Sequence, residues 1–170
     1  MLTIGFVLFS TVALVTFLLS IRHAVPKSED IDTLEARLKS VDLRAFLTLT
    51  DRRDAEFLHH SLQPAPLRRL LRLRARASLR YLKDLSWNVA ILLRIGELAA
   101  QSADQSIAEA GRELAGTAFR TRLLILRAFL RLAPQLVIPT SASAPGSQLL
   151  SDYLELSRRL TFVTHRFYPS

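Results

Sequence analysis

The sequence predicts an all-α protein in which a single N-terminal transmembrane helix precedes a four- to five-helix antiparallel bundle. Residues 2–21 contain twenty consecutive residues without a charge. The rest of the chain is rich in Leu, Ala, Arg and Glu, which favour helix, and holds few β-branched runs. Its apolar residues recur every three or four positions, which is the period of an amphipathic helix.

The uncharged run matches a membrane-spanning helix. Twenty residues at about 1.5 Å each cover about 30 Å, the thickness of the hydrocarbon core of a bilayer. A cleaved signal peptide is the alternative, but no cation precedes the run, which exceeds the usual 7–15 residues of a signal core. Cleavage after Ala24 would also put Arg22 at the −3 position, where a small residue is preferred. We therefore favour an uncleaved anchor that contacts the lipid bilayer through residues 2–21.

The cations that flank this anchor predict its orientation. Arg22, His23 and Lys27 follow the apolar run, and only the α-amino group precedes it. The positive-inside rule then places the C-terminal part in the cytoplasm, so the expected protein is a single-pass membrane protein with a cytoplasmic domain.

About 140 residues remain after the anchor, enough for one compact domain. The absence of cysteine excludes disulfides, thiolate metal sites and cysteine nucleophiles. Changes in composition and helix-breaking residues divide the chain into five predicted parts. These are an anchor at 1–22, a juxtamembrane linker at 23–30, a bundle core at 31–138, a flexible linker at 139–148 and a C-terminal helix at 149–170.

The first predicted helix of the bundle follows Pro26 and extends to about Leu47. Ser28 or Asp30 suits its N-cap. Its apolar face contains Ile31, Leu34, Leu38, Val41 and Phe46. Thr50 or Asp51 then suits the N-cap of a short helix that carries Phe57, Leu58 and Leu62.

The longest predicted helix follows the break at 63–66 and ends near Ala100, a length of about 50 Å. Pro66 fits its first turn, where an N–H group needs no helical partner. Its apolar positions, spaced by three and four, predict a core seam in which small residues allow close contact with another helix. The seam contains Leu71, Ala75, Ser78, Leu82, Leu85, Val89, Leu92 and Gly96. Among these apolar neighbours Asn88 predicts a buried hydrogen bond that fixes the packing.

Two further helices complete the predicted bundle. One begins at Ser102 or Asp104 and ends near Pro134, with Ile107, Gly111, Leu114, Ala118, Ile125 and Leu132 on its apolar face. The other covers about 148–166, with Leu150, Tyr153, Leu154, Leu160 and Phe167 on or near one face. Residues 123–138 are apolar, but Arg127 and Arg131 make a membrane crossing unfavourable by about 2.5 kcal/mol each.

The candidate functional surface is a basic stripe on the long helix, where the net charge of the chain is concentrated. Residues 63–100 hold eight cations and two anions, a net charge of +6 out of +8 for the chain. The predicted stripe consists of Arg69, Arg72, Arg76, Arg80 and Lys83, extended by Trp87 and Arg94. No acid interrupts residues 68–83, and like charges four residues apart repel by a few tenths of a kcal/mol. The stripe is therefore expected to meet an anionic partner.

Three partners are compatible with this stripe. The first is the chain's own set of acids, Glu29, Asp30, Asp32, Glu35, Asp51, Asp54 and Glu56. The second is an anionic phospholipid surface, to which each nearby Lys or Arg can add about 1 kcal/mol. The third is an acidic protein such as another subunit of a membrane complex, or nucleic acid. Nucleic acid is the least favoured because no recognised binding motif is present. The sequence does not predict the oligomeric state.

The sequence predicts neither a cofactor nor a metal. Glu56 and His59 match one half of a di-iron ligand pattern, but the second copy that such a site needs is missing. Phosphate-loop, nucleophile-elbow and zinc-protease motifs are also missing. We therefore expect a non-enzymatic, membrane-anchored helical scaffold, adaptor or accessory subunit of a membrane complex. The alternative is an envelope-facing protein that binds lipid or another apolar ligand in a cavity between its helices. An enzymatic function is the least supported interpretation.

Overall fold

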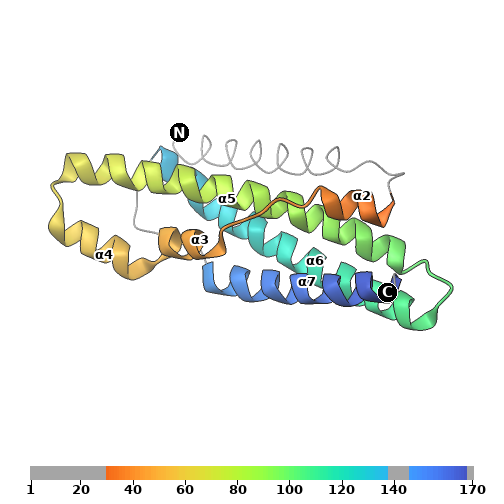
Figure 1. Ribbon diagram of the computed structural model, residues 1–170. Coiled ribbons are helices and arrows are strands. Elements are labelled where there is room, and N and C mark those ends of the chain that lie inside the picture. Colours follow the sequence, from red (N-terminus) through yellow and green to blue (C-terminus); the bar gives the residue numbers. More distant parts are fainter. Residues whose placement is uncertain (1–29, 138–145, 168–170) are drawn as a thin grey trace.

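The computed structural model describes residues 30–137 and 146–167, and the regular elements of this part of the chain are all helices, without a strand. Figure 1 shows how its elements are arranged. They are α2 (Ile31–Ala36), α3 (Leu43–Thr50), α4 (Arg52–Ser61), α5 (Pro64–Ala99), α6 (Gln105–Leu132), the 3-10 turn η1 (Ala133–Leu136) and α7 (Gly146–Phe167). The prediction of an all-α protein is therefore confirmed.

The long helices α5, α6 and α7 run antiparallel to their neighbours in sequence (Figure 1). The segment from α2 through α3 to α4 runs back along α5 as a discontinuous arm, so the described residues form a helical bundle of antiparallel parts. The α4–α5 turn lies at one end of α5, and the α5–α6 turn lies at the other. The helix α5 spans the bundle, because its 36 residues extend about 54 Å.

No helix in the described ranges combines the length and the apolarity that a membrane crossing needs. The predicted span at residues 2–21 lies outside the described residues.

The core lies between α5 and α6 and confirms the predicted seam. Every predicted seam residue of α5, from Leu71 to Gly96, is buried. On α6 the predicted face is also buried at five of its six positions, and Ile107 is half-buried. The second half of α5 is enclosed on most sides, because Ile91, Leu92 and Ile95 are all less than 3% exposed.

The α5 and α6 backbones touch where two glycines face the neighbouring helix. A Cβ atom on Gly96 would lie 2.7 Å from the backbone nitrogen of Ala115, and one on Gly111 would lie 2.7 Å from the carbonyl carbon of Ala99. Both distances are below van der Waals contact. These two positions therefore need glycine because the helices approach closely, as the small residues of the seam predicted.

The predicted continuous helix from residue 30 to residue 47 is wrong. The helix α2 ends at Ala36, and α3 begins at Leu43 after Asp42, whose side chain accepts a hydrogen bond from the Ala45 N–H. Between them the backbone at Lys39 is bonded to α5: its N–H donates to the Asn88 side chain at 2.9 Å, and its carbonyl accepts from that side chain at 2.7 Å. Because the backbone is satisfied by a distant side chain, the segment has no need of helical hydrogen bonds.

The C-terminal helix differs from the prediction at its start and on its buried face. It begins at Gly146, so residues 146–148 of the predicted linker are helical. The first turn of a helix tolerates this because its N–H groups need no partner within the helix. The buried positions are Leu149, Leu156 and Leu160, whereas Leu154 is 49% exposed. A spacing of seven and four residues places those three on one side of α7, toward the core.

Arg159 connects α7 to α6. Its Nε atom donates to Glu155 at 2.8 Å within α7, and its guanidinium also bonds to Glu113 of α6. Burial lowers the pKa of Arg159, but the two carboxylates outweigh this effect and raise it above the ordinary arginine value. The two carboxylates stabilise the charged form of Arg159, and the contact with Glu113 holds α7 in register with α6.

Candidate anionic-partner surface

The basic face of α5 is the exposed row of five cations Arg69, Arg72, Arg76, Arg80 and Lys83. These side chains share one side of the helix because they are spaced by three or four residues. The buried seam of the same helix begins at Leu71 and holds the opposite side against α6. The packing of the seam therefore determines that the five cations point to solvent, as predicted.

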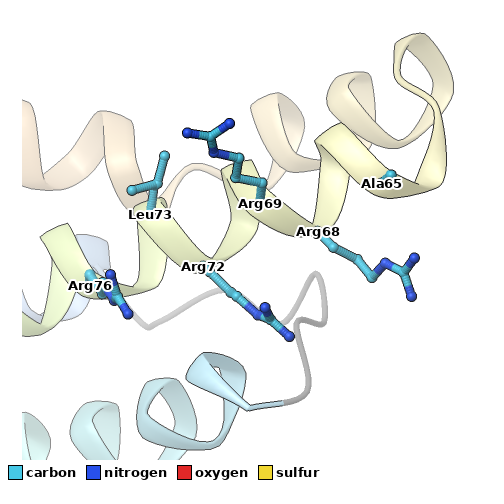
Figure 2. Close-up of a pocket in the computed structure, with 6 residues that line it drawn as sticks. All are labelled: Ala65, Arg68, Arg69, Arg72, Leu73 and Arg76. Carbon is cyan, nitrogen blue, oxygen red and sulfur yellow. The ribbon is translucent and has the colours of Figure 1, made fainter.

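A shallow groove of about 560 Å³ follows the start of this face. It is lined by Ala65, Arg68, Arg69, Arg72, Leu73 and Arg76, all on α5 (Figure 2). In the view of Figure 2, Arg69 and Leu73 extend from one edge of this face, and Arg68 and Arg72 extend from its other edge. A second groove of similar size continues from Leu73 and Arg76 past Arg80 to Tyr81 and Asp84. Together they make a continuous, open surface in which guanidinium groups surround an exposed leucine.

Arg68 belongs to this surface although it is not part of the predicted stripe. The side chain is exposed and lines the first groove. Its position beside Arg69 is outside the strict spacing of the stripe, so the helical period alone leaves it out. The sequence signal that points to it is the adjacent pair of arginines within a segment that contains no acid.

No carboxylate of the described residues forms an ion pair with the basic face or with Arg68. Arg72 donates a long hydrogen bond, 3.5 Å, to the carbonyl of Val137. Two of the acids expected to cover this face serve as helix caps instead: Asp30 caps α2, and Asp51 caps α4. Glu29 lies outside the described residues. The exposed guanidiniums can therefore bind an external anion.

Arg74 has a structural role that the sequence did not reveal. It lies on α5 outside the basic face, and its guanidinium bonds to three backbone carbonyls where α3 ends and α4 begins. The acceptors are the carbonyls of Leu49, Thr48 and Asp51, with 3.0 Å to Thr48 and 2.6 Å to Asp51. A cation at a helix C-terminus satisfies carbonyl groups that the helix itself leaves open.

The structure does not bring Arg94 into the same surface as the basic face. Its side chain is 23% exposed and pairs with Glu97 at 3.3 Å. Arg94 lies eleven residues beyond Lys83. Between them Trp87 is half-buried, and its indole N–H donates to the Arg37 carbonyl at 3.1 Å. The cation of Lys39 lies 5.6 Å from the centroid of the Trp87 ring. The basic face therefore ends at Lys83, where the segment between α2 and α3 covers α5.

Neither of the two grooves is the apolar cavity between helices that a lipid-carrying protein would need, because arginines of one helix line both. Within the described ranges, no three His, Cys, Asp or Glu residues are placed to hold a metal ion. Comparisons of the chain with protein families, with curated proteins and with solved structures gave no match.

The chemistry of this surface follows from its guanidinium groups. Each is planar and offers paired N–H donors that match the oxygens of a phosphate or a carboxylate. Arginine retains its charge at any physiological pH. A row of such groups favours an extended anionic surface over a single small anion.

Proposed function

We propose that this protein is a non-enzymatic scaffold, adaptor or accessory subunit of a membrane complex, anchored in the bilayer by residues 2–21. Its basic face would bind an anionic partner, either lipid or an acidic subunit. The observation that carries the proposal is the row of exposed cations on α5 with which no described carboxylate pairs. Their mutual repulsion disfavours such a row unless an anion meets it.

The anchor and its orientation are tested first. The chain lacks cysteine, so one cysteine introduced at Ala103, an exposed position in the α5–α6 turn, gives a single label. We expect the full chain to remain in the membrane during alkaline extraction. A membrane-impermeant maleimide should label the cysteine only after cell lysis. Labelling of intact cells, with a cytoplasmic control protein unlabelled, would overturn the proposed orientation.

The basic face is tested with two anionic probes. The full chain, reconstituted in neutral nanodiscs, is presented with polyglutamate and separately with vesicles that contain phosphatidylglycerol. We expect binding to at least one probe, weakened by salt because exposed charges are screened. Replacement of Arg72, Arg76 and Arg80 by glutamine should weaken it.

The matched control replaces Arg120, Arg127 and Arg131 of α6, which are also exposed, by glutamine. It removes the same number of charges from a different surface, so binding should be retained. Binding of neither probe, or an equal loss in both triple variants, would contradict the proposed role of the basic face.

A further inference from the structure

The basic face and the route to the predicted anchor lie on the same side of α5. Trp87 follows Arg69 by eighteen residues, which is five full helical turns, so both point in the same direction. Trp87 binds the Arg37 carbonyl, and next to it Asp84 pairs with Lys39 at 2.6 Å. The first half of this side of α5 therefore carries the cations, and the second half carries the chain that comes from the N-terminus.

The connection between that chain and the predicted span is short. Ile31 is buried at the start of α2, and α2 packs against α5. Only residues 22–30 separate it from the predicted span, and even a fully extended chain of this length reaches at most about 32 Å. The bilayer that holds the anchor therefore lies within about 32 Å of the start of α2.

The surface around the cations suits an interface between water and lipid. Leu73 lies among the arginines and is 52% exposed, and Leu70, three residues before it on α5, is 37% exposed. Leucines beside cations are typical of helices that lie in the headgroup region of a membrane. Arg69 and Lys83 are fourteen residues apart, so the row extends about 21 Å along α5. That length suits a plane of phosphate groups.

We infer that the basic face binds the phosphate groups of anionic lipids in the same leaflet from which the anchor emerges, with the first half of α5 lying along the membrane surface. This inference rests on the proposed membrane anchor. The arginines bind phosphates, and Leu73 enters the headgroup region. The fixed position of residues 37–39 on α5 sets the side of the bundle that faces the lipid.

The experiment places an environment-sensitive fluorophore on a cysteine at Leu73 in the full chain. A second sample carries it at Leu154 of α7, which is exposed to a similar extent, 49%. Both are reconstituted in nanodiscs made of phosphatidylcholine alone or with one-fifth phosphatidylglycerol, each with a quencher attached to the lipid headgroups. We expect quenching at Leu73 only in the anionic nanodiscs and no comparable quenching at Leu154.

The charge dependence is tested with the two triple variants. Each arginine near an anionic leaflet contributes roughly fivefold to binding, so replacing Arg72, Arg76 and Arg80 by glutamine should reduce the equilibrium constant for docking of α5 on the lipid by up to about 100-fold. Quenching at Leu73 should then disappear. The variant with glutamine at Arg120, Arg127 and Arg131 should keep it.

The outcomes separate this inference from the proposed function. A chain that resists alkaline extraction but shows equal quenching at Leu73 in both lipids, or none in either, would overturn the inference and leave the anchor standing. The acidic subunit would then be the remaining partner. A chain that is stripped from the membrane by alkaline extraction would overturn the anchor and this inference together.

Discussion

The side-chain amide of Asn88 on α5 forms two hydrogen bonds with the backbone of Lys39, one in each direction, across 49 residues of sequence. The same amide nitrogen also donates to the Tyr153 hydroxyl of α7 at 2.8 Å. Asn88 is completely buried. One amide thus joins α5, α7 and the segment between α2 and α3. This contact holds that segment on α5 just beyond the end of the basic face.

Replacement of Asn88 by leucine should destabilise the bundle. The substitution leaves the partly buried Lys39 N–H and carbonyl without their partner. An unsatisfied group costs about 1–3 kcal/mol when it is buried, so we expect a loss toward the lower end of this range. Urea unfolding of the full chain in mild detergent measures the loss. Trp87 is the only tryptophan and lies against this segment, so its fluorescence reports on the contact directly.

The control for this prediction is Lys39→Gln. It removes the ion pair between Lys39 and Asp84, in which the two side chains are 47% and 40% exposed. It keeps the hydrogen bonds between the Lys39 backbone and Asn88. Exposed pairs contribute at most about 1 kcal/mol. A loss from Lys39→Gln equal to that from Asn88→Leu would contradict the importance of the amide.

Two glycines of α6 should respond to alanine in opposite directions. At Gly111 the added Cβ would collide with the backbone of α5, so the helices must move apart, at a cost of about 1–3 kcal/mol. At Gly116 nothing lies within 4 Å of the added Cβ, so the better helix propensity of alanine should add about 0.5–1 kcal/mol. Thermal unfolding of the two variants should therefore give shifts of opposite sign. A stabilising Gly111→Ala would show that the helices are not in close contact there.

Two nearby arginines of α5 should differ in their effect on stability. Arg74→Gln removes bonds to three carbonyls at the α3–α4 junction, and bonds from charged donors contribute about 1.5–3 kcal/mol each in favourable cases. Solvent access reduces this, so we expect a loss of about 2 kcal/mol. Arg76→Gln should change the free energy of unfolding by less than about 0.5 kcal/mol, because its side chain is exposed and on the basic face. Hydrogen exchange should detect faster opening of α3 in the first variant only.

The basic face should reduce the stability of the bundle in the absence of an anion. Replacing Arg72, Arg76 and Arg80 by glutamine removes three like-charge pairs spaced by four residues, at 68/72, 72/76 and 76/80. Each pair costs about 0.2–0.5 kcal/mol, and the attraction between Arg80 and Asp84 that is lost with them offsets part of the gain. We expect this variant to be more stable than the natural chain by about 0.5–1 kcal/mol at low ionic strength. The difference should disappear in concentrated salt, where surface charges are screened. Equal stability at low salt would mean that the repulsion is already relieved within the protein.

The sequence by itself determined the helical class, the seam of α5 and the position of the basic face. All three depend on a period of three to four residues, which a single helix imposes on its own side chains. The cap of α4 at Asp51 was also predictable, because a capping side chain bonds to N–H groups within three residues of it. Local sequence contains the information that such short-range interactions need.

The tertiary structure alone decided which of these local patterns persist. The apolar period continues through residues 37–42, but the helix is interrupted because Asn88 binds the Lys39 backbone from another helix. Arg94 has the spacing of the basic face, yet packing of the second half of α5 leaves its side chain only 23% exposed. Arg74 has no local partner and binds carbonyls more than twenty residues away. Periodicity specifies the direction in which a side chain points, whereas its partner depends on which segment packs there.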